Sequence, residues 1–150
     1  MSGTLEANKN LVRRQLQELW NEKKGPEHAG EFWAEDVEIH NKAMPNAPTG
    51  LAGVNAHMAV LFNVFPDWHF EIHDLIAEGD KVVAHITMSG TYQTTSMHLN
   101  NLPAAGQPVK REQINIFTIR DGKIIEMRSV ADQLGMQKMA EAASSVAGRK

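Results

Sequence analysis

The sequence predicts an α+β fold in which N-terminal helices pack against a strongly curved antiparallel sheet. Two observations lead to this prediction. Apolar residues recur with a helical period before Pro66, whereas after Pro66 they alternate with a period of two. Helical and extended segments are therefore separated along the chain, which is typical of α+β proteins and not of βαβ units. Because antiparallel sheets usually bury one face, we expect the helices to cover the inner face.

Three helices are predicted in the first part of the chain. The first begins near Thr4, a suitable N-cap, and ends before Pro26. A short second helix follows and includes Trp33, and a third covers residues 51–65. The first and third helices each carry one apolar stripe, which we expect to face the sheet. The stripes consist of Val12, Leu16, Leu19 and Trp20, and of Leu51, Val54, Met58, Leu61, Phe62 and Phe65.

Strands are predicted at residues 37–41, 68–73, 81–92, 109–119 and 123–131. The last two are joined at Asp121-Gly122, a strong signal for a type I′ hairpin turn. Residues 93–108 read as a long loop, and such loops often close or line binding sites. A last helix is predicted to carry Leu134, Met139 and Ala143.

Composition restricts the class of protein. The 150 residues are 42% hydrophobic and 22% charged, as in one globular domain, which we expect to span residues 1–150. Fifteen Lys and Arg against 18 Asp and Glu leave a net charge of −3, so the sequence predicts no binding to nucleic acid or to a membrane. The chain has no cysteine, which excludes disulfides and thiolate metal sites and fits a cytoplasmic protein.

The hairpin predicts which residues share a face of the sheet. If Arg120 pairs with Lys123 and pairing continues without interruption, Asn115 faces Arg128. A single bulge in either strand would invert part of this assignment. Alternation puts Arg111, Gln113, Asn115, Phe117, Ile124, Glu126, Arg128, Val130 and Asp132 on one face. It puts Glu112, Ile114, Ile116, Thr118, Ile125, Met127, Ser129 and Ala131 on the other.

The first of these faces allows two interpretations. It is apolar near the turn and polar farther away, as the wall of a small-molecule cavity would be. A solvated face with an Arg111–Asp132 ion pair would show the same pattern. Asp132 is also placed to be the N-cap of the last helix. As a general base it would need an apolar pocket to raise its pKa, an effect that a close Arg111 would oppose.

Other catalytic motifs are missing from the sequence. None of the seven histidines forms a metal-ligand pattern, and there is no phosphate-binding glycine loop, dinucleotide fingerprint or Gly-x-Ser-x-Gly motif. His57 lies beside the apolar stripe of its helix and is predicted at the surface. His40 and His85 lie within predicted strands, and each could face the interior.

Several short motifs occur together in a specific order. They are Asn8-Lys9, Leu19-Trp20-Asn21, residues 37–40, residues 50–54, Phe65-Pro66-Asp67, residues 74–80, Gly90-Thr91, Leu102-Pro103 with Gly106, Ile116-Phe117, residues 121–126 and Asp132-Gln133-Leu134-Gly135. In this order the chain resembles the SnoaL-like polyketide cyclases, or ester cyclases, of the nuclear-transport-factor-like superfamily. The resemblance runs from about residue 8 to residue 139.

The resemblance implies a cone-shaped fold around a pocket, a small-molecule substrate and a homo-oligomer. It implies that Asp132 acts as general acid/base in an intramolecular aldol condensation or a related isomerisation, without a metal or an organic cofactor. A histidine at the position of His40 is usual in the family, so we expect His40 to take part in catalysis. We expect substrate to contact Gln113, Asn115, Arg128, Arg111, Tyr92, Trp33, Met58, Phe62 and Trp68.

The sequence also departs from the family pattern. Met127-Arg128 stands where the family usually has His-Trp, and Tyr92 replaces a usual histidine. These changes disfavour a polycyclic anthracycline substrate and favour a smaller or anionic one. A non-catalytic ligand-binding domain remains an alternative. An epoxide hydrolase is a weaker one, because Gln113 stands where a second carboxylate would be needed. The outer face, with Ile114, Ile116, Ile125 and Met127, is predicted to form a homodimer.

Overall fold

The computed structural model describes residues 2–41, 49–93, 106 and 108–132. The helices and strands are α1 (Ser2–Arg14), the π-helix η1 (Gln15–Asn21), the 3₁₀ turn η2 (Ala29–Glu31), β1 (Trp33–Asn41), α2 (Gly50–Val64), β2 (His69–Glu78), β3 (Lys81–Thr91), β4 (Pro108–Arg120) and β5 (Lys123–Ala131). The predicted last helix with Leu134, Met139 and Ala143 lies outside the described residues, as does most of the predicted loop before β4. Within the described residues, no helix is long and apolar enough to cross a membrane.

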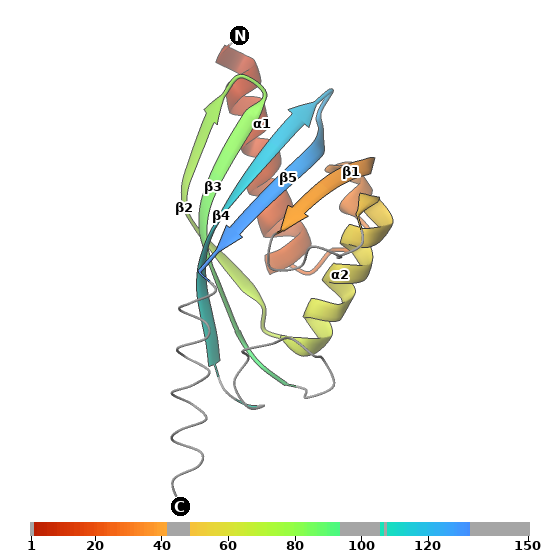
Figure 1. Cartoon of the computed structure of the whole chain (residues 1–150), viewed down its shortest axis with the longest axis vertical. Helices are drawn as coiled ribbons and strands as arrows, with labels where there is room; N and C mark the ends of the chain where they lie inside the picture. The colour runs from red at the N-terminus through yellow and green to blue at the C-terminus, as the bar shows by residue number, and fades with distance from the viewer. Residues whose placement is uncertain (1, 42–48, 94–105, 107, 133–150) are drawn as a thin grey trace, which may run out of the picture.

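The five strands form one sheet in the order β1-β5-β4-β3-β2 (Figure 1). Strands β2 to β5 pair antiparallel with their neighbours, which confirms the prediction for the segments after Pro66. Strand β1 instead pairs parallel with β5, so the sheet is mixed. Figure 1 shows the sheet curving around α1, with α2 beside β1.

Strand β1 is longer than the sequence pattern indicates. The prediction of a second helix that includes Trp33 is wrong, because Trp33 begins β1 and pairs with Ile124 of β5. The backbone N–H of Ile124 also donates to the carbonyl of Phe32, at 2.8 Å. The Trp33 ring is only 3% exposed and lies edge-on to Phe117, with ring centroids 6.1 Å apart. Tertiary packing therefore overrides the local helical pattern.

The helical segment formed by α1 and η1 is hydrogen-bonded to edge strand β2 of the sheet. The apolar stripe with Leu16 and Leu19 is buried as predicted, and α1 continues into η1. At the end of η1, the Asn21 side chain donates to the carbonyl of Phe70 at 2.8 Å and accepts from the Phe70 N–H at 2.7 Å. These two bonds satisfy backbone groups of edge strand β2. Unpaired groups at a sheet edge could otherwise pair with a strand of another chain.

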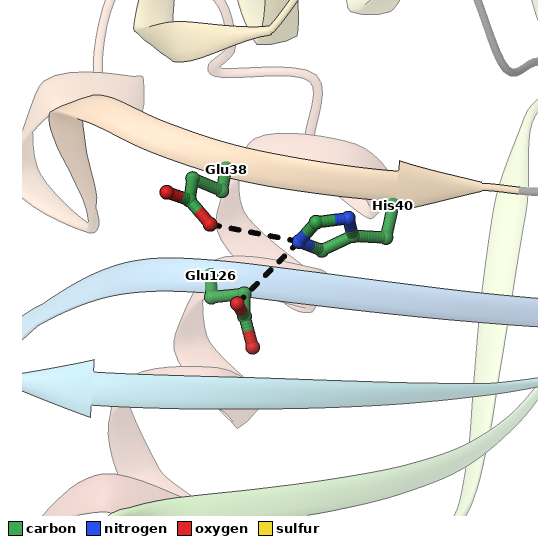
Figure 2. A group of neighbouring side chains, drawn as sticks. All are labelled: Glu38, His40 and Glu126. Carbon is green, nitrogen blue, oxygen red and sulfur yellow. Dashed lines mark ion pairs between the residues drawn. The ribbon is translucent and has the colours of Figure 1, made fainter.

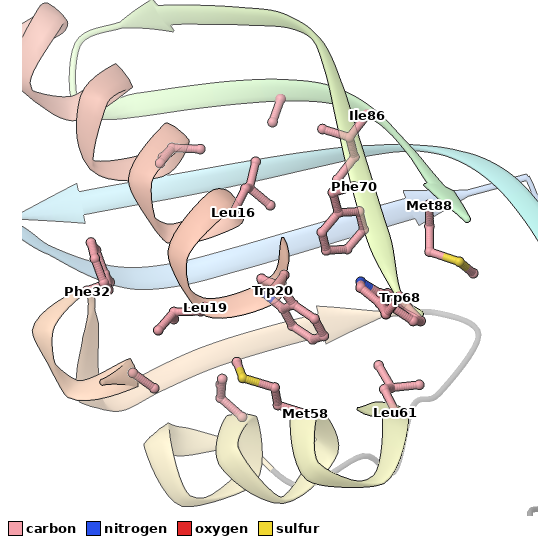
Figure 3. Packing of buried hydrophobic residues seen from close by; sticks show 14 of the residues in the cluster. Leu16, Leu19, Trp20, Phe32, Met58, Leu61, Trp68, Phe70, Ile86 and Met88 are labelled. Atoms are coloured by element: carbon pink, nitrogen blue, oxygen red, sulfur yellow. The ribbon is translucent and has the colours of Figure 1, made fainter. Parts of the chain in front are cut away.

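Aromatic side chains fill the space between η1, α2 and β2. Trp20, Trp68 and Phe70 contact one another with ring centroids 5.3–5.4 Å apart (Figure 3). The predicted stripe of α2 takes part, because Met58 is fully buried and Leu61 lies on the same side (Figure 3). This aromatic group forms one end of the core and the wall of the site described below.

The β4–β5 hairpin follows the prediction at its turn and departs from it farther on. Asp121 and Gly122 have φ values of 52° and 74°, as a type I′ turn requires. Arg120 pairs with Lys123, but the register shifts between Thr118 and Ile119. This bulge is the interruption that would invert the faces of β5. The predicted face assignment beyond it is therefore wrong for β5 and right for β4.

Candidate functional site

A cavity of about 100 Å³ lies between the inner face of the sheet, η1 and α2. Its wall is mostly apolar, and its polar groups come from adjoining strands. The lining residues are Gln15, Leu16, Trp20, Trp33, Ile39, Asn41, Gly53, Val54, His57, Leu61, Trp68, Phe70, Arg111, Gln113, Asn115, Phe117, Met127 and Ser129. An apolar wall with a few convergent polar groups is the usual character of a small-molecule site.

Three side chains of β4 form a continuous polar row: Arg111, Gln113 and Asn115. They share a face because they alternate along one strand. The Nη2 group of Arg111 donates to Oε1 of Gln113 at 2.9 Å, and Nε2 of Gln113 donates to Oδ1 of Asn115 at 3.2 Å. Each amide oxygen thereby accepts a hydrogen bond from its neighbour in the row, and the Nδ2 group of Asn115 is the terminal N–H donor of the row. The polar row is oriented to offer N–H groups.

The polar row continues across the sheet onto β5 and β1. Asn115 pairs with Ser129, and Ser129 pairs with Asn41. Nearer the turn the corresponding row is apolar, with Phe117 opposite Met127 and Met127 opposite Ile39. The predicted gradient from apolar to polar along this face is therefore present, although β5 contributes other residues than predicted.

The three tryptophans of the sequence, Trp20, Trp33 and Trp68, all line the cavity. The indole N–H groups of Trp33 and Trp68 are buried without a hydrogen-bond partner among the described residues. The side-chain oxygen of Gln15, in the same wall, is likewise buried without one. Buried tryptophan N–H groups usually have a partner, so these donors are available to a bound molecule.

Arg111 is the one cation in the described wall of the cavity, and no Asp or Glu is among the lining residues described. Burial lowers the pKa of the Arg111 guanidinium from its ordinary value. Its Nε atom is buried and has no hydrogen-bond partner in the described part of the chain. Arg111 as a whole is half-buried, and a charge withdrawn from water without an opposite charge beside it costs free energy.

His57 was predicted at the surface, but the structure places it in the cavity wall. Burial lowers the pKa of His57, and the positive charge of Arg111 lowers it further. The imidazole is therefore neutral at neutral pH. The sequence held a weak signal for this position, because Gly53, His57 and Leu61 follow one another at intervals of four on α2 and all line the cavity.

The structure brings together five of the predicted binding residues: Arg111, Gln113, Asn115, Trp33 and Trp68. Four others do not line the cavity. Met58 and Tyr92 are buried in the core, where Tyr92 packs against Phe65 with ring centroids 6.0 Å apart. Phe62 is half-buried and lies edge-on to Trp20, at 5.7 Å.

Arg128 is the fourth, and its predicted position on the inner face is wrong. Because of the bulge, Arg128 pairs with Ile116 and lies on the outer face. More than half of its side chain is exposed to solvent. The inner positions on either side of it belong to Met127 and Ser129.

Asp132 follows directly after β5 and is exposed. Its backbone N–H donates to the carbonyl of Glu112 at 3.0 Å, which extends the β4–β5 pairing by one residue. It is not among the residues that line the cavity, and the predicted helix that it would cap lies outside the described residues. The neighbouring inner residue, Ala131, pairs with Gln113 of the polar row.

His40 lies on the outer face of the sheet, between Glu38 of its own strand and Glu126 of β5 (Figure 2). Its Nε2 atom is 3.6 Å from a carboxylate oxygen of Glu38 and 3.4 Å from one of Glu126. The three ligand atoms lie within 4.8 Å of one another, and among the described residues this is the group that could hold a divalent cation. Arg128 already provides a positive charge 3.9 Å from Glu126. The predicted catalytic residue His40 is thus separated from the cavity by the sheet.

His85 also lies on the outer face. Its Nδ1 atom is 3.3 Å from Asp74 and its Nε2 atom is 3.1 Å from Glu112. The hydrogen bonds to Glu112 and then to Asp74 raise the pKa of His85. His73 stands beside it, with ring centroids 4.9 Å apart. These contacts belong to the surface of the sheet and not to the cavity.

The curved sheet and the helices enclose a mostly apolar cavity with one polar row. This arrangement is typical of small-molecule-binding proteins of the nuclear-transport-factor-like fold. Residues 10–139 match the sequence model of the SnoaL-like polyketide cyclases, and the chain belongs to that family. No match is found among curated proteins.

Solved structures agree with this assignment. A structure from Jannaschia sp. CCS1, described as a SnoaL-like polyketide cyclase, is 26% identical, with a TM-score of 0.80 over 95% of this chain and 96% of that one. TsrD from Streptomyces laurentii is 26% identical, with a TM-score of 0.75 over 91% of this chain and 96% of that one. IdmH from Streptomyces antibioticus is 23% identical, with a TM-score of 0.72 over 87% and 96%, and it supports the fold alone.

Proposed function

We propose that this protein catalyses an intramolecular aldol condensation, or a related isomerisation, of a small carbonyl compound without a cofactor. The polar row in a mostly apolar cavity is the observation that carries the proposal. Fixed N–H donors in a site that excludes water stabilise negative charge as it develops on an oxygen. An enolate is the intermediate of both reactions, and it places such a charge on oxygen.

The proposed reaction begins with removal of a proton from the carbon next to a carbonyl. Nδ2 of Asn115 and the guanidinium of Arg111 would donate to the resulting enolate oxygen. In the condensation, the enolate carbon then forms a C–C bond to a second carbonyl of the same molecule, whose oxygen takes up the proton. In the isomerisation, the proton returns to a different carbon. Neither route needs an oxidant or a reductant.

Asp132 is the proposed acid/base group, on the resemblance of its position to the family's catalytic aspartate. It lies one residue beyond Ala131, which pairs with Gln113 of the polar row. A substrate that extends from the polar row toward this end of β5 would approach the carboxylate. A bound substrate would cover the exposed carboxylate, as the environment of a general base requires.

The experiment that tests this role compares Asp132→Asn with Glu112→Gln on a panel of small diketones and keto esters. Loss of a general acid/base typically costs about 10²–10⁴-fold in rate. We expect a loss of that size for Asp132→Asn and little change for Glu112→Gln, which removes an exposed carboxylate at the same end of the sheet. Full activity of Asp132→Asn would show that another group moves the proton.

A ligand-binding protein without turnover is the second candidate. It is favoured by one observation: the residues described in the cavity wall include no carboxylate. Saturable binding of a carbonyl compound without any conversion would support this candidate. The same observation gives no support to an epoxide hydrolase, whose Asp-Arg-Asp set would need two carboxylates at the cavity.

We also propose a homodimer formed through the outer face of the sheet. Ile76, Ile114 and Val130 are 63%, 43% and 65% exposed there, and large exposed apolar surface is typical of an interface. Met127, predicted for this interface, lines the cavity instead. Sedimentation should give a dimer at micromolar concentration, and Val130→Glu should shift it toward monomer. A monomeric wild type would contradict the proposal.

A further inference from the structure

We propose that the end of the cavity formed by Arg111 and His57 binds a carboxylate, so that the substrate is an organic acid with a flat, apolar body. This inference rests on the proposed function, because it assigns a substrate class to the same cavity. It adds a group to the substrate that the enolate chemistry does not itself require.

The first argument is the charge balance of the cavity. Arg111 brings a positive charge into the wall, and the described lining residues supply no negative charge. The interaction of Arg111 with Gln113 involves one Nη group and a neutral amide. Withdrawing an ion from water without placing an opposite charge beside it costs free energy in general. A bound anion would remove that cost, whereas a neutral ligand would not.

The second argument is the geometry of the donors. A guanidinium offers five N–H groups in a plane and matches a carboxylate with two parallel hydrogen bonds. Its Nε–H is buried and has no partner in the described part of the chain. The indole N–H groups of Trp33 and Trp68 are in the same condition. The described cavity thus has several donors without acceptors, which suits the oxygens of an acid.

The third argument is the state of His57. It lines the cavity with Arg111, which is the other titratable group among the described lining residues. The neutral polar residues that face the same space include Gln15, Asn41 and Ser129. A neutral imidazole can donate one N–H to a carboxylate without adding a second positive charge to the apolar wall. Once an anion neutralises Arg111, His57 can also take up a proton.

The aromatic part of the cavity wall restricts the rest of the molecule. Trp20, Trp68 and Phe70 present aromatic surfaces within a volume of about 100 Å³. For comparison, a dry apolar cavity of about 150 Å³ in another protein holds a benzene molecule. The smaller volume here therefore limits the apolar body to at most a single ring or a conjugated chain of similar size, with its carboxylate at Arg111.

The test uses benzoate and benzamide, which have nearly the same shape and differ in charge. All three tryptophans line the cavity, so intrinsic fluorescence reports binding directly. We expect benzoate to bind the wild type at least about tenfold more tightly than benzamide. Arg111→Gln should lose this preference, and Arg120→Gln, which removes an exposed arginine of the same strand, should keep it. Equal affinities in the wild type, or an unchanged preference in Arg111→Gln, would overturn the inference.

A stability measurement separates this role from a structural one. If Arg111 serves the ligand, Arg111→Met should raise or leave unchanged the melting temperature of the ligand-free protein, because an uncompensated buried charge is removed. If Arg111 holds the fold together, the melting temperature should fall. The outcome is also independent of turnover. Equal affinities of the wild type for benzoate and benzamide, together with turnover that depends on Asp132, would reject only this inference. A benzoate preference in a protein without turnover would reject only the proposed reaction.

Discussion

Phe117 of β4 faces Met127 of β5, whereas an uninterrupted ladder from the Asp121-Gly122 turn would bring it opposite Glu126. The difference is one residue, taken up by the bulge next to Ile119. Because side chains alternate along a strand, this single extra residue decides which set of alternate β5 residues faces the cavity. It places Met127 and Ser129 inside and Arg128 outside.

This register makes a prediction that the uninterrupted ladder would reverse. Met127→Ala should reduce the free energy of unfolding by at least about 1 kcal/mol, because it removes packed apolar volume next to Phe117. Arg128→Ala should change it by no more than about 0.5 kcal/mol, as is usual for an exposed side chain. Urea unfolding of the two variants checks this. A larger loss for Arg128→Ala would contradict the register.

The sequence was sufficient for those parts of the fold that depend on local chemistry. The type I′ turn needs positive φ at two residues, and Asp-Gly supplies it, so the hairpin could be predicted. Alternation then fixed the common face of Gln113 and Asn115, because both lie on β4, before the bulge has any effect on β5. The parallel pairing of β1 could not be predicted, since it depends on contacts between residues about ninety positions apart in the sequence.

The site was harder to predict than the fold, for a physical reason. A bulge has no strong sequence signal, and Arg128 changes side with it. The sequence predicts His57 at the surface because its polar ring lies at the edge of an apolar stripe. In the folded chain that edge borders the cavity and not solvent. The sequence predicts Trp33 and Trp68 as substrate contacts, but only the tertiary structure shows that their N–H groups lack partners among the described residues.

Asp67 is expected to fasten the turn between α2 and β2 to the end of β3. Its two carboxylate oxygens accept hydrogen bonds from the N–H and the hydroxyl of Thr91, at 2.7 and 2.8 Å. The bond from the Thr91 N–H is the largest cause of the lowered pKa of Asp67. Because the pKa is lower in the folded state, the stabilisation is present above an unfolded value of 3.8 and is lost as the pH falls through the folded value.

Asp67→Asn should therefore lower the free energy of unfolding at neutral pH by about 1 kcal/mol or less, since the pair is exposed. Denaturant unfolding at neutral pH and at pH values below the ordinary pKa of aspartate measures the effect. We expect the difference between variant and wild type to shrink at the acidic end. Thr91→Val replaces the hydroxyl with a methyl group and keeps the N–H donor, so it is the matched variant for comparison with Asp67→Asn. A constant difference at all pH values would contradict this role for the charge.

His85 should stabilise the protein in the opposite pH direction. Hydrogen bonds to Glu112 and Asp74 raise its pKa in the folded state above the ordinary value of 6.5. Its contribution is therefore fully present below pH 6.5 and is lost as the pH rises through the folded pKa. His85→Gln should be less stable than the wild type on the acidic side of this range and should approach it on the alkaline side. The melting temperature as a function of pH checks the trend, and a difference between His85→Gln and the wild type that is the same at every pH would contradict it.

His57 should respond to Arg111 and to a bound acid. Burial, followed by the positive charge of Arg111, lowers its pKa in the folded state, so its contribution to stability is present above pH 6.5 and is lost as the pH falls. Arg111→Gln removes the second cause and should raise the pKa of His57 in an NMR titration of the imidazole protons. Saturation with benzoate should also raise it, because the anion offsets the charge of Arg111. A pKa of His57 that is unaffected by both would show that the two side chains do not share one electrostatic environment.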